Sequence, residues 1–303
     1  MSLAPAPTLA AVVRERMGVS WSRAKALCSD GRVAVNGERV LDPAARVGAD
    51  AVVVIDAHGP KVRKESVLTP AALVHVDRDV VVVDKPAGLL SVADEEGNRD
   101  TLVDRVRMVL RRTHGRDADG PLGVVHRLDR DTSGLIVFTR NAAALRSLGA
   151  QFREHEIDRL YHAIIHGHIA AQRVETMLLL DRGDGLRGSF GLFRRAKGEP
   201  PPTARSAVTH LQPLEPLEEA MLVACRLETG RQHQIRIHLA ELGHPLLGER
   251  VYIRDFKGTV IDAPRVMLHA RTLGFVHPRS GEAVRFEREA PEDFTAMVAA
   301  LRA

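Results

Sequence analysis

A polar stretch from Ala57 to Pro70 divides the 303-residue chain and strongly limits how it can fold. Basic residues bracketed by prolines are typical of a linker between domains. One hydrophobic core usually stops growing at roughly 250 to 300 residues, so a chain of this length favours two cores. We therefore expect a small domain over residues 1–57, a linker over 58–71 and a large domain over 72–303.

The small domain is predicted to contain two short helices and a hairpin. Ser20 can cap the second helix, whose polar side carries Arg23 and Lys25. The dipeptide Asn36-Gly37 lies between two short apolar runs, and both of its residues tolerate the positive φ of a type I′ turn. A small α/β domain with one basic helix face follows from this pattern.

The large domain is predicted to contain more short strands than helices. This balance favours an α+β fold, with a mixed, largely antiparallel central sheet and flanking helices, over a doubly wound fold. The run at 182–198, rich in glycine and arginine, is predicted to be a mobile loop. Strands are expected at 73–76, 80–83, 124–125, 135–139, 160–165, 174–180, 204–209 and 222–227, and helices near 101–112, 142–152, 234–242 and 294–301.

The basic residues are mostly arginine. Only six of the 43 are lysine, which leaves 37 arginines, and the forked guanidinium group suits phosphate. A pI near 9.4 favours a polyanionic partner. The net charge of +4 is modest, however, and an arginine-rich genome would give the same bias, so charge alone decides little.

The two cysteines, Cys28 and Cys225, lie far apart in the sequence. They support neither a disulfide framework nor a thiolate metal site, and they fit a reducing cytoplasm. Residues 1–7 lack the cationic start and apolar segment of a signal peptide, and no stretch approaches the ~18 apolar residues of a membrane span. We expect a soluble, unprocessed cytoplasmic protein.

The segment HRLDRDTSG at 126–134 lies between two predicted strands and places two carboxylates among two arginines and a histidine. On spacing alone, the more common arrangement is a turn in which Asp129 or Asp131 accepts hydrogen bonds from nearby backbone N–H groups. The alternative is a carboxylate held in its charged form by neighbouring guanidinium groups. Such a carboxylate could act as a nucleophile or base.

The segment TGRQHQIRIH at 229–238 opens a predicted helix. A helix N-terminus attracts anions, and Arg231, His233 and Arg236 add positive charge there, although a solvated helix start is equally plausible. His233 and His238 are five residues apart, not the four of a helical zinc pair, and no glutamate lies between them. We therefore expect these histidines to form hydrogen bonds, and we expect no metal site.

Tyr161 lies on a predicted strand, on the face shared with Ala163 and Ile165. It is either a core aromatic with a satisfied hydroxyl group or a functional residue near the charged loop. The sequence contains no Walker loop, no dinucleotide glycine fingerprint and no Gly-x-Ser-x-Gly elbow. A reaction without a cofactor is the simplest expectation.

These segments together resemble the RluA-type pseudouridine synthase family, which modifies large-subunit ribosomal RNA. The two main motifs are HRLDRDTSG and GRQHQIRIHLAELGHPLLGERVY, at 126–134 and 230–252, with support from VVVDKPAGLL at 81–90 and LHARTLGFVHP at 268–278. The likeness extends from about Leu73 to Phe294. Residues 19–40, VSWSRAKALCSDGRVAVNGERV, resemble the small RNA-binding S-four domain.

The resemblance implies a catalytic cleft and a role for each matching residue. Asp129 becomes the catalytic aspartate, Arg236 its partner, and Tyr161 the aromatic residue that stacks on uracil and assists proton removal. Arg127 occupies the space vacated by the flipped base, and Ile235 lines the pocket. Beyond the resemblance, we expect His126 and Arg231 to contact the substrate, and Arg23, Lys25 and Arg32 to contact RNA.

The implied activity is an isomerisation that needs no cofactor. A uridine is extruded from the RNA stack, the bond from ribose C1′ to uracil N1 breaks, and the base is rejoined through C5. Ribosomal RNA is favoured over transfer RNA as partner, and a monomer without an obligate protein partner is expected. The alternatives are a transfer RNA pseudouridine synthase, a non-catalytic RNA-binding or ribosome-assembly factor, and a metal-dependent hydrolase using the 14 histidines.

Overall fold

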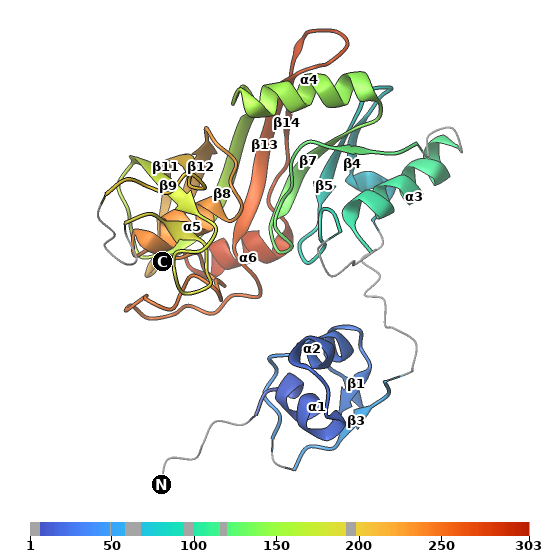
Figure 1. The fold of residues 1–303 in the computed structure, drawn as a ribbon, viewed down its shortest axis with the longest axis vertical. Helices are drawn as coiled ribbons and strands as arrows, with labels where there is room; N and C mark the ends of the chain where they lie inside the picture. Colours follow the sequence, from blue (N-terminus) through green and yellow to red (C-terminus); the bar gives the residue numbers. More distant parts are fainter. Residues whose placement is uncertain are drawn as a thin grey trace. The chain divides into compact units, whose positions relative to one another are not determined.

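The computed structural model describes residues 7–48, 50–57, 68–93, 100–115, 120–191 and 198–302. The chain forms two compact units, Met1–Ser66 and Val67–Ala303 (Figure 1). Each unit has its own hydrophobic core. Most of the expected linker lies outside the described residues, and its end overlaps a short 3-10 helix, η1 (Pro70–Ala72).

The small unit packs two helices against a three-stranded antiparallel sheet. The side chain of Ser20 caps the second helix by accepting the N–H of Arg23, and the predicted hairpin turn has φ of 52° at Asn36 and 85° at Gly37. The sheet order is β2-β1-β3. The elements are α1 (Leu9–Met17), α2 (Trp21–Ser29), β1 (Val33–Val35), β2 (Glu38–Arg39) and β3 (Val53–Ile55).

The large unit is built on one sheet in the order β10-β9-β11-β12-β8-β13-β7-β5-β4, with β14 beside β13 and β6 beside β7. Of the described pairings only β13 with β7 is parallel, so the expected mixed, largely antiparallel sheet is confirmed. The strands are β4 (Leu73–Val76), β5 (Val80–Lys85), β6 (Gly123–Val124), β7 (Ser133–Thr139), β8 (Asp158–His166), β9 (Gln172–Leu179), β10 (Gly188–Ser189), β11 (Arg205–Leu217), β12 (Ala220–Leu227), β13 (Leu268–Val276) and β14 (Ala283–Glu287).

Helices cover both faces of this sheet: α3 (Leu102–His114), α4 (Ala142–Arg153), α5 (Gln234–Glu241) and α6 (Glu292–Ala300). Because side chains alternate along a strand, Val81 and Val83 of β5 join the core beneath α3 and α5. Val80 and Val82 pack on the opposite face, together with α4. Among the described residues, no helix is both long and apolar enough to cross a membrane.

The central strand, β13, is not among the strands predicted from the sequence. Nearly all its side chains are buried on both faces, yet several are polar, so it shows neither an apolar run nor a clear alternation. His269 is one such residue: it is fully buried and its Nδ1 lies 3.0 Å from Ser133 Oγ. The expected mobile loop at 182–198 also contains a strand, β10, which pairs with β9, while 192–197 lie outside the described residues.

A glycine permits the parallel pairing at the centre of the sheet. Gly134 has a φ of 106° and lies opposite Ala270 of β13. A Cβ atom on Gly134 would overlap the Ala270 carbonyl group. The start of β7, which overlaps the end of the HRLDRDTSG segment, therefore requires glycine.

Candidate active site

The loop that carries Asp129 is fastened by an earlier segment of the chain. The fully buried Lys85 ammonium group donates to three backbone carbonyl oxygens, including that of Arg130 at 2.8 Å. Ser91 Oγ donates to the Leu128 carbonyl oxygen at 2.7 Å and accepts its N–H at 3.0 Å. The residues on both sides of Asp129 are therefore held in place. Neither Lys85 nor Ser91 is among the site residues predicted from the sequence.

Arg236 reaches Asp129 from helix α5. Its Nη1 donates to Asp129 Oδ2 at 3.2 Å, while its Nε and Nη2 donate to the two oxygens of Glu249 at 2.7 and 2.8 Å. Burial opposes the charge of Arg236, but the hydrogen bonds and charge of Glu249, together with Asp129, raise its pKa. Burial also raises the pKa of Glu249, but the hydrogen bonds from Arg236 have the larger combined effect, so the Glu249 pKa is lowered.

His233 and Tyr252 complete the surroundings of Asp129. His233, with a left-handed φ of 59°, immediately precedes α5, and its Nε2 lies 3.8 Å from Asp129 Oδ2. Its Nδ1 is 2.8 Å from the Tyr252 hydroxyl group, and the Arg236 guanidinium lies 5.4 Å from the centre of the Tyr252 ring. Burial lowers the pKa of His233 and raises that of Tyr252 to about 12.

A cavity of about 760 Å³ opens beside Asp129. It brings together five of the residues that the sequence singles out, namely His126, Arg127, Asp129, Tyr161 and Arg231. Burial raises the pKa of the Tyr161 hydroxyl group. The cavity is also lined by residues that the sequence analysis does not select: Val124, Val125, Leu145, Arg146, Gly149, Phe152, Arg153, His155, Arg159, Leu227, Gly230 and Gln232.

Two predicted substrate residues have structural contacts. Ile235 is buried in the core cluster that also contains Tyr161, and it does not line the cavity. His126 lies on the cavity wall, where its Nε2 accepts the N–H of Val137 at 3.1 Å and its ring stacks on Phe152 at 4.6 Å. Burial lowers the pKa of His126 to about 3, so its ring is neutral at neutral pH.

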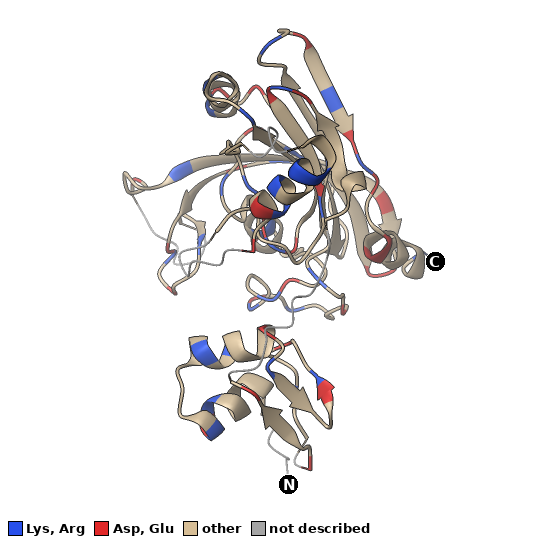
Figure 2. Ribbon diagram, turned by 90° about the vertical axis from the view of Figure 1, so that its right-hand side faces the viewer, with Lys and Arg blue, Asp and Glu red and all other residues tan. Residues whose placement is uncertain are grey.

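The small unit presents a basic helix face. Arg23 and Lys25 are exposed on α2, and Figure 2 shows basic residues on both helices of this unit. Arg32 differs from them, because it is half-buried and its Nη1 donates to the backbone oxygen of Ala57. Two of the three predicted RNA contacts are thus free at the surface, and the third is already engaged within the unit.

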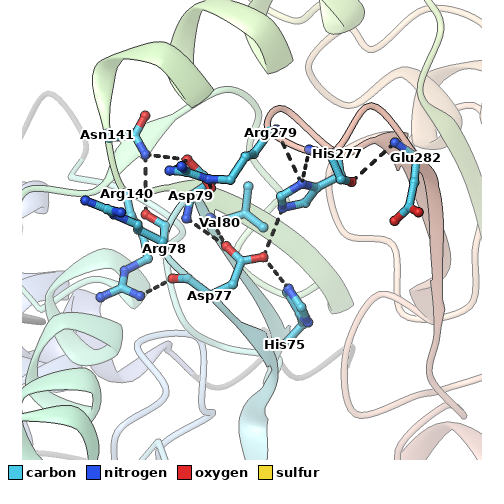
Figure 3. Close-up of polar contacts among 11 residues, drawn as sticks. His75, Asp77, Arg78, Asp79, Val80, Arg140, Asn141, His277, Arg279 and Glu282 are labelled. Atoms are coloured by element: carbon cyan, nitrogen blue, oxygen red, sulfur yellow. Dashed lines mark hydrogen bonds and ion pairs between the residues drawn. The ribbon is translucent and has the colours of Figure 1, made fainter.

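One cluster in the described residues has the composition of a metal site: His75, Asp77 and His277 (Figure 3). Both Nε2 atoms approach Asp77 Oδ2, at 2.6 and 2.9 Å. However, Nδ1 of His277 faces the backbone N–H groups of Arg279 and Ser280. This Nδ1 must accept, so Nε2 carries the proton and donates to Asp77. The cluster is a hydrogen-bonded network that joins β4 to the end of β13.

Comparisons with known proteins agree with this architecture. Residues 79–241 match the RNA pseudouridylate synthase family, and residues 9–53 match the S4 domain. The chain is 37% identical to ribosomal large subunit pseudouridine synthase D of Zymomonas mobilis over 91% of this chain and 87% of the relative. It is 34% identical to an uncharacterized RNA pseudouridine synthase of Bacillus subtilis, with 93% and 90% covered.

Solved structures show the same fold. Human RNA pseudouridylate synthase domain containing 4 superposes with a TM-score of 0.61 at 23% identity, covering 76% of this chain and 93% of that one. Human RNA pseudouridylate synthase domain containing 1 gives a TM-score of 0.53 at 26% identity, covering 73% and 83%. The fold and its cavity thus define an RNA-modifying isomerase.

The match covers more than half of the chain, and the curated relatives align over nearly all of it. The chain belongs to the RNA pseudouridylate synthase family. Its N-terminal unit is an S4 domain.

Proposed function

We propose that this enzyme converts specific uridines of large-subunit ribosomal RNA to pseudouridine, with Asp129 as its catalytic carboxylate. The observation that carries the proposal is the Arg236–Asp129 ion pair of 3.2 Å at the edge of a cavity rich in arginine. Relatives from Zymomonas mobilis and Vibrio cholerae, both named ribosomal large subunit pseudouridine synthase D, support the choice of RNA.

The chemistry explains why a carboxylate is needed. Breaking the bond from C1′ to N1 leaves its electron pair on uracil and builds positive charge on the ribose. Asp129 can stabilise that charge, form a bond to C1′, or remove the proton from C2′. The base then turns and C5 bonds to C1′, while a bond from Asp129 to C1′ breaks or the proton taken from C2′ is returned. A proton leaves C5 and one is gained at N1. No atoms are gained or lost overall.

Two further residues serve base flipping. Extruding the uridine costs about a few kcal/mol, and stacking on an aromatic ring returns roughly 1 to 3 kcal/mol per base. Tyr161 lines the cavity, and its ring would stack on uracil while its hydroxyl group assists removal of the C5 proton. Arg127 is exposed and forms no hydrogen bond with any described residue, so it is free to enter the space that the base leaves.

The proposed division of labour follows the two units. Residues 1–57 would hold RNA through phosphates at Arg23 and Lys25, residues 58–71 would link, and 72–303 would catalyse. Cys28 and Cys225 are both free thiols, which suits the reducing cytoplasm we propose as its location. We also propose that it acts as a monomer.

The decisive experiment maps pseudouridines in total RNA from cells that lack the enzyme and are complemented with wild type, Asp129→Asn or Asp131→Asn. We expect pseudouridines in large-subunit ribosomal RNA with wild type and Asp131→Asn, and none with Asp129→Asn. Asp131 is the matched control, since it lies on the same loop. Modified positions confined to transfer RNA would overturn the choice of substrate, and turnover by Asp129→Asn would overturn the catalytic assignment.

A further inference from the structure

Arg159 is a buried cation with few partners. It is 5% exposed and lines the cavity beside Asp129. Its Nη2 donates to the backbone oxygen of Glu228 at 3.1 Å, and its buried Nε has no hydrogen-bond partner. It forms no ion pair with any residue that the structure describes. A buried guanidinium normally has a carboxylate partner, because an unpaired buried charge is costly.

The surroundings of Arg159 direct it toward the cavity. Arg159 precedes Tyr161 by two residues on β8, so both side chains lie on the same face of the strand. Its guanidinium lies 5.6 Å from the centre of the Phe152 ring. On another side it packs against Gly230, where a Cβ atom would overlap Nη1. The guanidinium is therefore held between a ring and a bare backbone.

Depth separates Arg159 from the other arginines of the cavity. Arg127, Arg146 and Arg153 are exposed, which suits contacts with solvated phosphates. Arg231 is half-buried, and its Nε donates to the backbone oxygen of Ser206 at 3.0 Å. Arg159 alone among these five is buried. A ligand that reaches it must enter the cavity, as an extruded base does, whereas the phosphate chain stays outside.

We propose that Arg159 donates a hydrogen bond to a carbonyl oxygen of the flipped uracil and stabilises the negative charge that the base acquires during the reaction. This inference rests on the proposed function. When the C1′–N1 bond breaks, its electron pair spreads over N1 and the two carbonyl oxygens of uracil. The charge disappears when C5 bonds to C1′. No proton passes through Arg159, which stays charged although burial lowers its pKa.

Such a contact is stronger in the transition state than in the bound substrate, so it acts on the rate of the reaction. The loss of one donor to a developing oxyanion typically slows the reaction by about 10²- to 10³-fold. We expect kcat to fall by about 10²- to 10³-fold in Arg159→Gln, and KM to change by less than about tenfold. Arg159→Lys keeps a charged donor and should recover part of the rate.

The assay follows tritium release from uridine labelled at C5 in total RNA taken from cells that lack the enzyme. Arg226→Gln is the matched control, because it removes an exposed arginine of β12 that pairs with Asp158 outside the cavity. It should keep wild-type rates. Equal losses in Arg159→Gln and Arg159→Lys, accompanied by a lower melting temperature, would show a structural role and overturn the proposal.

A raised KM with unchanged kcat, and a shallower dependence of kcat/KM on salt, would show a phosphate contact and also overturn it. Gly230→Ala is a second variant, which displaces Nη1 while keeping the charge. It should lower kcat, and combining it with Arg159→Gln should add little. If wild type releases tritium only from transfer RNA, the proposal of a ribosomal RNA substrate is wrong. The rates of the Arg159 variants and of wild type can still be compared on transfer RNA.

Discussion

Glu249 and Asp129 bind two sides of one guanidinium group. Glu249 accepts hydrogen bonds from Nε and Nη2 of Arg236, and Asp129 accepts one from the remaining Nη1. Glu249 also accepts backbone N–H groups from Val251 and Tyr252 at 2.9 and 3.3 Å, so it is itself fixed. The orientation of the Arg236–Asp129 ion pair is therefore set by a carboxylate that does not face the cavity.

Replacing Glu249 by glutamine should impair both stability and turnover. The variant keeps the shape but leaves the Arg236 charge buried with only Asp129 as a partner. Removing one member of a buried pair typically costs about 3 to 5 kcal/mol, and we expect the free energy of unfolding to fall by that order. Urea unfolding followed by tyrosine fluorescence measures it, since Tyr161 and Tyr252 both lie in the large unit. Glu287→Gln, on an exposed pair with Arg285, should change little.

Lys85→Met should release the loop that carries Asp129. Three carbonyl oxygens lose the Lys85 donor. That of Arg130 still accepts the N–H of Gly88, and each buried group left unsatisfied costs about 1 to 3 kcal/mol. We expect faster hydrogen exchange at the amide of Thr132, which donates to the Asp129 carbonyl oxygen. We also expect kcat to fall by at least about tenfold, because Asp129 would no longer be held in position. Unchanged exchange at this amide would contradict the fastening role of Lys85.

His126 should make the large unit sensitive to acid. Its folded pKa of about 3 lies below the unfolded value of 6.5, so between these values the unfolded chain binds one more proton. Stability is therefore lost as pH falls below 6.5, by about 1.4 kcal/mol per pH unit from this group. His126→Phe should lack that contribution.

His238 and His269 have folded pKa values of about 4, so they also make stability depend on pH. Their contributions are the same in wild type and in His126→Phe. The difference between the two curves thus isolates His126. Parallel curves for wild type and His126→Phe between pH 6.5 and 4 would refute the assignment.

The small unit should increase the affinity of the protein for RNA without a preference for particular RNA sequences. Arg23→Ala combined with Lys25→Ala removes two exposed charges, so the slope of log Kd against log salt should fall by about two. The kcat at saturating RNA should stay unchanged. Trp21, the only tryptophan, reports whether the unit remains folded. A salt slope equal to that of wild type would exclude this helix from RNA binding.

Local patterns predict the short elements well, because caps and turns depend on neighbouring residues. The Ser20 cap and the Asn36-Gly37 turn both form as expected. The contact of Asp129 with Arg236 joins residues 107 positions apart and enters the sequence analysis only through a family resemblance. Glu249 could not be identified, because nothing local distinguishes a buried carboxylate from an exposed one.

Arg159 could have been identified as a cavity residue from the sequence. It lies two residues before Tyr161, and the period of a strand places both side chains on one face. Strand β13 shows the opposite situation. Its histidine and threonine are buried, and His269 finds a partner in Ser133 of β7, so polarity, which normally marks exposure, misleads there.

Strand β13 lies between β7 and β8, although it follows them by more than 100 residues in the chain. During synthesis, β7 and β8 leave the ribosome long before the strand that separates them. A nascent chain at that stage carries two unpaired strand edges, which invite pairing with other chains. The residues that line the cavity lie within 124–161 and 227–232, so their final arrangement around this strand waits until translation of the domain is almost finished.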